Sequence, residues 1–183
     1  MKTVTVLKSI FLGVLFSLTN CQADKTDPEY PGYIKGKHNG EDWLRPKIKI
    51  SYLHYCSPAK EKIGFSVAAN TSFSYLDEWV SIYHIPTKSG IYTVENNDFK
   101  QNCSQVVANN SWVNIDVSLA DYKVYKTPTK YNQVTISKID TVANTVEGSF
   151  ELFFIATKKD RPVFPDTIQL SGTFQSPISL PYK

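Results

Sequence analysis

Apolar and polar residues alternate along most of the chain with a period of two residues, the spacing of a β-strand that has one buried face. In the clearest run, residues 145–156, four large apolar side chains share one face: Val146, Phe150, Leu152 and Phe154. Residues 167–174 alternate in the same way after a proline-rich loop. We expect these two runs to form a long antiparallel pair with one buried face.

Shorter runs of the same kind fill the rest of the chain, at residues 33–38, 47–55, 63–69, 79–85, 91–94, 106–107, 113–117, 122–124 and 134–136. Asn39-Gly40 follows the first run and predicts a tight hairpin turn. Trp43 comes just after this turn, and its side chain is expected to be buried in the hydrophobic core. About ten short strands without helical periodicity are typical of a sandwich or a barrel. The fold class is therefore all-β, an antiparallel two-sheet β-sandwich, with a lipocalin-like β-barrel as the alternative.

Two glycines interrupt the apolar face of the last two runs. Gly148 lies in Glu147-Gly148-Ser149-Phe150, and Gly172 lies in the similar Ser171-Gly172-Thr173-Phe174. A glycine inside a strand indicates a bend or a close approach of another backbone. We expect one of these at each position, and a duplicated ligand site is the alternative interpretation.

The first twenty residues have the three parts of an export signal. Lys2 and Lys8 give a positive start, the apolar core of residues 10–18 is too short to cross a bilayer, and Leu18-Thr19-Asn20-Cys21 resembles a lipoprotein cleavage site. We expect a signal peptide at 1–20, a lipidated Cys21, a tether over 21–31 and a single β domain over 32–183. The competing interpretation is ordinary cleavage after Ala23, which would release a soluble periplasmic or secreted protein.

Charge and cysteine usage add two expectations. The chain has 20 Lys and Arg against 17 Asp and Glu without a basic cluster, which argues against a nucleic-acid partner. Once Cys21 carries lipid, Cys56 and Cys103 remain, and an exported chain meets an oxidising compartment, so we predict that these two are bridged. The alternative is two free thiols that lie too far apart to meet. A metal site at His54, Cys56 and His84 is a further hypothesis, but the disulfide explains Cys56 more simply.

Three short motifs resemble those of small Bacteroidota envelope lipoproteins of unknown function. They are the opening Asn39-Gly40-x-x-Trp43, the middle Gly90-x-Tyr92-x-Val94 and the closing Gly-Ser/Thr-Phe pair described above. The resemblance implies a lipoprotein of the cell envelope with a β-sandwich-like domain, and we expect it at the outer membrane. It implies no catalytic residue.

The same resemblance draws attention to a modification signal, because Bacteroidota O-glycosylate Asp-Ser/Thr-apolar triplets. Asp140-Thr141-Val142 and Asp166-Thr167-Ile168 have this form. Thr141 and Thr167 are therefore candidate O-glycosylation sites, and chance occurrence of the triplets is the alternative.

Residues for catalysis are sparse. The chain has three histidines and lacks a Gly-x-Ser-x-Gly nucleophile motif. His38 falls in the first hairpin, where solvation is expected, and the carboxylates Asp77, Glu78, Asp116 and Glu151 are interpreted as ordinary surface charges. We therefore expect no enzymatic activity, no cofactor and no bound metal.

Aromatic residues are the better candidates for a binding site. Trp112 is out of phase with Val113 and Ile115, so it is expected to face away from the core, beside Asn114 and Asp116. Together with Trp79, these residues could form a shelf for a sugar ring or a partner protein. The alternative is a tryptophan covered by a loop or by a second sheet.

Three functions remain open at this point. The first is a lipid-anchored, non-enzymatic module that binds a glycan, a small ligand or a partner protein. The second is a lipocalin-like carrier with an apolar ligand inside, and the third is a hydrolase of unrecognised type. The third requires a histidine or two carboxylates within hydrogen-bond reach of each other.

Overall fold

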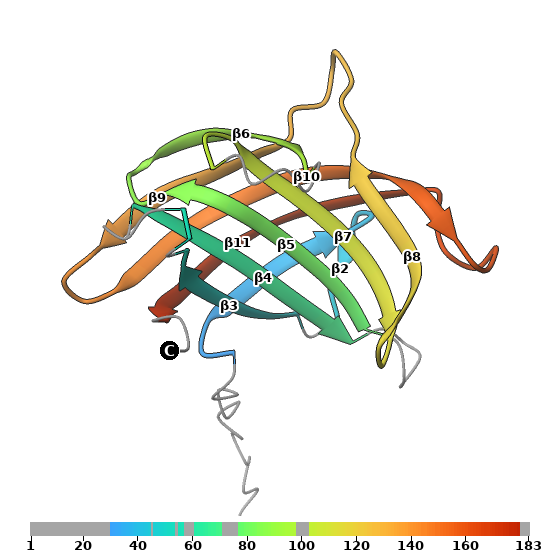
Figure 1. Cartoon of the computed structure of the whole chain (residues 1–183), viewed down its shortest axis with the longest axis horizontal. Coiled ribbons are helices and arrows are strands. Elements are labelled where there is room, and N and C mark those ends of the chain that lie inside the picture. Colours follow the sequence, from blue (N-terminus) through green and yellow to red (C-terminus); the bar gives the residue numbers. More distant parts are fainter. Residues whose placement is uncertain are drawn as a thin grey trace, which may run out of the picture.

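The computed structural model describes residues 30–44, 46–53, 55–56, 61–70, 77–97 and 103–179. Within this part of the chain all regular structure is β-strand (Figure 1). The strands are β1 Tyr33–His38, β2 Glu41–Asp42, β3 Pro46–Tyr52, β4 Lys62–Asn70, β5 Asp77–Pro86, β6 Gly90–Asn96, β7 Val106–Asn114, β8 Val117–Val124, β9 Gln133–Asp140, β10 Thr145–Lys159 and β11 Thr167–Ser179. The all-β prediction is confirmed.

Hydrogen bonds join the strands into one large, strongly curved sheet. The order is β2-β1-β11-β3-β4-β5-β7-β6-β9-β10-β8, with further pairings of β10 with β11 and of β7 with β8. The sheet bends around its core, so that β3, β4, β5 and β7 form a layer in front of β10 and β11 (Figure 1). The two layers of this sandwich-like fold therefore belong to a single sheet.

The strand connections argue against the lipocalin-like alternative. Lipocalins are up-and-down barrels in which each strand pairs antiparallel with its neighbour in the chain. Here β11 pairs parallel with β3, β6 pairs parallel with β7, and β5 pairs with β7 instead of with β6.

Alternation fills the inside of the curved sheet with large apolar side chains. β10 and β11 pair in continuous antiparallel register, as predicted, from Thr145 opposite Pro177 to Ile155 opposite Thr167. The rings of Phe150 and Phe174 lie 5.7 Å and 5.2 Å from the ring of Phe65 on β4. Aromatic packing of this kind joins the two layers.

The first hairpin and the two strand glycines behave as predicted. Asn39 and Gly40 both have positive φ, 53° and 87°, as a tight two-residue turn requires. A Cβ atom on Gly172 would lie only 2.7 Å from the carbonyl oxygen of Lys35, because the paired strand β1 comes close there, with Gly36 opposite Gly172. At Gly148 the register between β10 and β9 shifts, so the strand bends at this residue.

The prediction of one strand through 113–117 is wrong. A hairpin turn lies at Ile115 and Asp116, between β7 and β8, and Ile115 is 87% exposed with a φ of 56°. The inner face of β7 carries Ala108, Asn110 and Trp112. The alternation of Val113, Ile115 and Val117 predicts that these residues face the core. The strand instead turns Asn110 and Trp112 inward, and neither is aliphatic.

Candidate functional site

A glutamate lies inside the apolar core at one end of the sheet. Glu78 belongs to the inward face of β5, in phase with Val80 and Ile82, and is 2% exposed. Asn110 donates a hydrogen bond from Nδ2 to Glu78 Oε1 at 2.6 Å, and Trp43 donates from Nε1 to Oε2 at 3.2 Å. A buried carboxylate is costly unless it is paired and hydrogen-bonded, and these two donors offset part of that cost.

His38, the last residue of β1, connects this carboxylate to the surface. Its Nε2 lies 3.3 Å from Glu78 Oε1, and its side chain is 20% exposed. Burial disfavours the charged imidazolium, but the hydrogen bonding and charge of Glu78 outweigh burial, so the pKa of His38 is raised above its ordinary value. The expectation that His38 is solvated is therefore wrong.

Unpaired polar atoms gather around the same carboxylate. Among the described residues, four buried side-chain atoms have no hydrogen-bond partner, and three of them are His38 Nε2, Asn110 Oδ1 and Trp112 Nε1. His38 Nε2 interacts with Glu78 Oε1 at 3.3 Å, so the atoms of this group that lack any partner are Asn110 Oδ1 and Trp112 Nε1. Since buried polar groups are normally satisfied, such a concentration calls for a ligand or ordered water.

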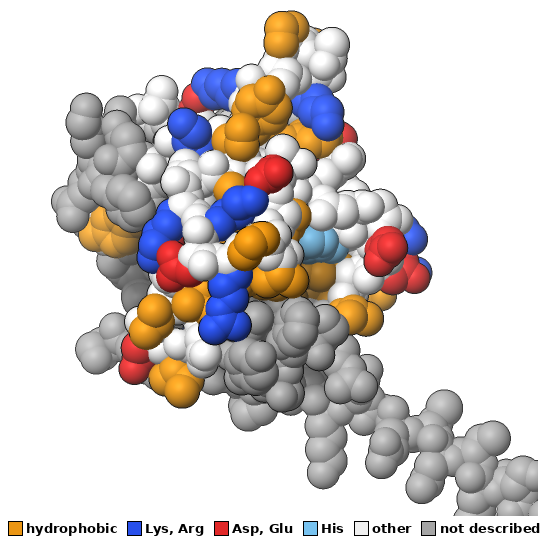
Figure 2. Space-filling view, turned by 90° about the vertical axis from the view of Figure 1, so that its right-hand side faces the viewer, with side chains coloured by type: hydrophobic (Ala, Val, Ile, Leu, Met, Phe, Trp, Pro, Cys, Tyr) orange, Lys and Arg blue, Asp and Glu red, His pale blue; other side chains and the backbone are white. Residues whose placement is uncertain are grey.

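Aromatic rings pack against one another beside these atoms. The Trp112 ring lies 5.4 Å from Phe164, which follows β10, and 6.4 Å from His38. The ring of Trp43 also lies 6.4 Å from the ring of His38. We call His38, Trp43, Glu78, Asn110, Trp112 and Phe164 the Glu78 cluster. Figure 2 shows one face of the molecule, on which one histidine side chain (pale blue) is visible at the surface among hydrophobic and uncharged groups.

The raised pKa of His38 predicts a pH-dependent contribution to stability. Its stabilising effect is fully present below the unfolded-state pKa and is lost as the pH rises through the higher folded-state pKa. The difference in free energy of unfolding between the wild type and His38→Gln should therefore be larger at about pH 6 than at about pH 9. Urea titrations of both proteins at the two pH values measure it, and a difference that grows with pH would contradict the pairing with Glu78.

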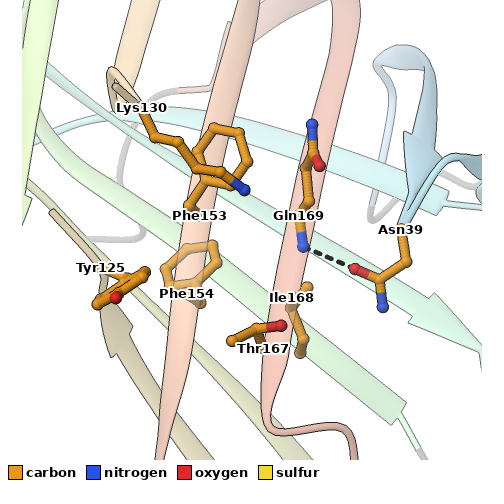
Figure 3. Close-up of a pocket in the computed structure, with 8 residues that line it drawn as sticks. All are labelled: Asn39, Tyr125, Lys130, Phe153, Phe154, Thr167, Ile168 and Gln169. Atoms are coloured by element: carbon orange, nitrogen blue, oxygen red, sulfur yellow. Dashed lines mark hydrogen bonds between the residues drawn. The ribbon is translucent and has the colours of Figure 1, made fainter. Parts of the chain in front are cut away.

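A second, shallower site lies on the outer face of β10 and β11. It is a groove of about 210 Å³ between the Asn39 turn and the segment that joins β8 to β9 (Figure 3). The Lys130 ammonium lies 4.1 Å from the centre of the Phe153 ring, and Asn39 Oδ1 accepts a hydrogen bond from the Gln169 amide. Because these groups already interact with one another, the groove has fewer unpaired groups for a ligand than the Glu78 cluster has.

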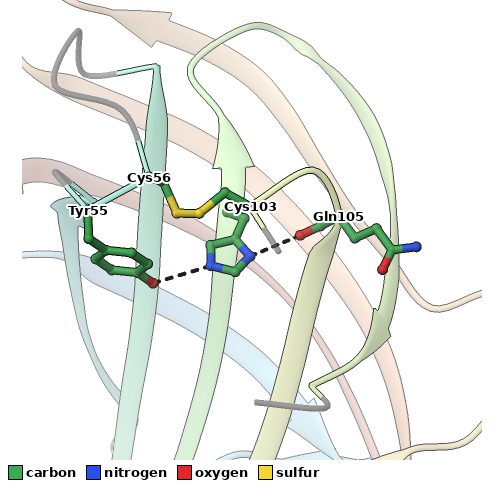
Figure 4. Close-up of a disulfide and its surroundings, with 5 residues drawn as sticks. Tyr55, Cys56, Cys103 and Gln105 are labelled. Atoms are coloured by element: carbon green, nitrogen blue, oxygen red, sulfur yellow. Dashed lines mark hydrogen bonds between the residues drawn. A yellow bond between two sulfur atoms is a disulfide. The ribbon is translucent and has the colours of Figure 1, made fainter. Parts of the chain in front are cut away.

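The predicted disulfide is confirmed. Cys56 and Cys103 are bonded, with their Cα atoms 5.6 Å apart. The bond lies beside the imidazole of His84, whose two nitrogens contact Tyr55 and Gln105 (Figure 4). His54, the other residue of the metal alternative, lies outside the described residues.

The predicted shelf of Trp112, Asn114, Asp116 and Trp79 is not assembled. Trp112 faces inward and packs against the core, so the outward interpretation is wrong, and the alternative in which it is covered is correct. Asn114 is the last residue of β7, Asp116 lies in the exposed β7–β8 turn, and Trp79 points to the face of β5 opposite Glu78. Of the four residues, only Trp112 belongs to the Glu78 cluster.

Sequence reasoning missed Glu78, His38 and Asn110. Glu78 was interpreted as a surface charge, although it shares the phase of Val80 and Ile82 and this was the available signal. Asn110 gave no signal, because its inward direction follows from the pairing of β7 with β5. The candidate glycosylation residues Thr141 and Thr167 are both exposed, and their modification stays a prediction.

Comparisons with known proteins give no relative. No family model, no curated protein and no solved structure matches the chain. Cys21 and the expected signal peptide lie outside the described residues. Within the described ranges, no helix has the length and apolar character needed to span a membrane.

Proposed function

We propose that the chain is a lipid-anchored protein of the bacterial cell envelope that binds a small polyhydroxylated ligand, such as a sugar unit of a glycan, at the Glu78 cluster. The observation that carries this proposal is that two buried polar atoms without a partner, Asn110 Oδ1 and Trp112 Nε1, lie on residues next to the buried carboxylate of Glu78. Aromatic rings pack beside these atoms.

The unpaired atoms are complementary to hydroxyl groups. Trp112 Nε1 can only donate a hydrogen bond and Asn110 Oδ1 can only accept one, whereas a hydroxyl does both. The rings of Trp112 and Phe164 provide the apolar surface on which a sugar ring packs. A ligand with neighbouring hydroxyls would satisfy both atoms at once.

Binding is favoured over hydrolysis by the way the carboxylate is held. His38 and Glu78 do lie close together, as a hydrolase would require. However, both oxygens of Glu78 already accept hydrogen bonds, from Asn110 and Trp43, so the carboxylate serves to orient its neighbours. The aromatic packing of Phe65, Phe150 and Phe174 in the interior likewise argues against an apolar carrier.

The binding proposal is tested on a glycan array with fluorescently labelled mature domain. Trp112→Phe keeps an aromatic ring but removes the indole N–H, and one lost hydrogen bond in a buried site corresponds to roughly tenfold weaker binding. Trp79→Phe, on the opposite face of the same sheet, is the matched control and should bind like the wild type. Equal binding by Trp112→Phe, or no glycan bound by the wild type, would contradict the proposal.

The location is tested independently of the ligand. The signal pattern before Cys21 supports lipidation, and the Cys56–Cys103 bond is consistent with an oxidising compartment. Intact-mass analysis of protein from the envelope fraction should find residue 21 as the acylated first residue, and Cys21→Ala should leave the protein unacylated. A mature protein that begins after Ala23 would contradict the anchor and support the soluble alternative.

A further inference from the structure

The surroundings of the disulfide contain a second set of functional groups, distant from the Glu78 cluster. The sulfur atoms of Cys56 and Cys103 and one ligand atom of His84 all lie within 4.8 Å of one another. Two thiolates and an imidazole are the donors that zinc prefers. The disulfide accounts for the two sulfur atoms but does not by itself require an imidazole beside them.

His84 is held in the manner of a metal ligand. It lies at the irregular pairing of β5 with β4 and has a φ of 65°, which is uncommon for a residue with a side chain. Because a carbonyl oxygen only accepts, Nδ1 carries the proton and donates to the Gln105 carbonyl at 3.1 Å. Nε2 therefore carries the lone pair of the ring and accepts a hydrogen bond from the Tyr55 hydroxyl at 3.2 Å. A metal ion at Nε2 would take the place of this hydrogen bond. A backbone carbonyl that fixes the imidazole in this way is the usual second contact of a zinc-binding histidine.

We propose that reduction of the Cys56–Cys103 bond converts this region into a zinc site with Cys56, Cys103 and His84 as protein ligands. A dithiol reductant supplies two electrons and two protons, the S–S bond breaks, and two thiols form while the reductant becomes a disulfide. Zn²⁺ then displaces both thiol protons, and water takes the fourth position. Metal–ligand distances of roughly 2.0–2.3 Å in a tetrahedral site require the two sulfur atoms to move apart once the S–S bond is broken, while the nearby imidazole of His84 completes the set of protein ligands.

The test uses the mature domain reduced with a phosphine and titrated with Co²⁺ as a spectroscopic probe for zinc. The reduced wild type should bind one equivalent of Co²⁺ with thiolate-to-metal charge-transfer absorption, and Zn²⁺ should displace it. The oxidised protein should bind none. His84→Ala should weaken binding at least tenfold, whereas Ser81→Ala, on the outer face of the same strand, should bind like the wild type.

Folding of the reduced chain is followed by circular dichroism in the same samples. If reduction unfolds the domain, added Zn²⁺ should restore the β-sheet spectrum, because metal binding then contributes folding free energy. A reduced wild type that neither binds Co²⁺ nor refolds with Zn²⁺ would overturn the proposal. An unchanged Co²⁺ affinity and spectrum in His84→Ala would overturn it as well.

Discussion

Replacement of Glu78 by alanine is expected to lower the free energy of unfolding by about 3–5 kcal/mol, the range for removing one partner of a buried charged pair. The carboxylate is the common acceptor for Asn110 and Trp43 and the counter-charge of His38. Without it, three buried polar groups lose their partner in an apolar core, and each keeps its desolvation cost.

Urea denaturation of matched variants measures this loss. Glu78→Gln keeps one acceptor oxygen and should lose less than Glu78→Ala. Glu151→Ala, on the outer face of β10, should lose less than about 1 kcal/mol, as is usual for a surface position. A Glu78→Ala protein as stable as the wild type would mean that the carboxylate does not organise this end of the core.

Removal of the disulfide is expected to cost about 4 kcal/mol. Cys56 and Cys103 are 47 residues apart, and the chain-entropy model gives this value for a loop of that length. The double variant Cys56→Ala, Cys103→Ala should therefore unfold at a much lower urea concentration than the wild type.

Thiol counting provides the control for this second prediction. The unreduced mature domain should show no free thiol at Cys56 or Cys103, and the wild type under reducing conditions should approach the stability of the double variant. Two free thiols in the unreduced wild type would contradict the prediction. Equal urea midpoints for the unreduced wild type and the double variant would contradict it as well.

Local patterns predicted the parts of the fold that depend on local rules. The alternation of β10 and β11 determines their buried face, and Asn39-Gly40 suits a turn with two positive φ angles. Cys56 and Cys103 could be paired by elimination, because the chain contains three cysteines and one belongs to the expected lipidation site.

Long-range pairing explains what could not be predicted. The direction of Trp112 depends on its register opposite Glu78 on β5, and no property of the 113–117 segment determines that register. The Glu78 cluster combines residues from β1, β5 and β7 with Trp43 and Phe164 from connecting segments. Single residues of this kind carry no recognisable spacing in the sequence, so the site becomes visible only when the sheet is assembled.

A crystal structure of the mature domain, soaked with the sugar that the glycan array identifies, tests the central claim most directly. We expect sugar hydroxyls within about 3 Å of Trp112 Nε1 and Asn110 Oδ1, with the ring against Trp112 and Phe164. A sugar bound in the groove over Phe153, with only ordered water at the Glu78 cluster, would contradict the account.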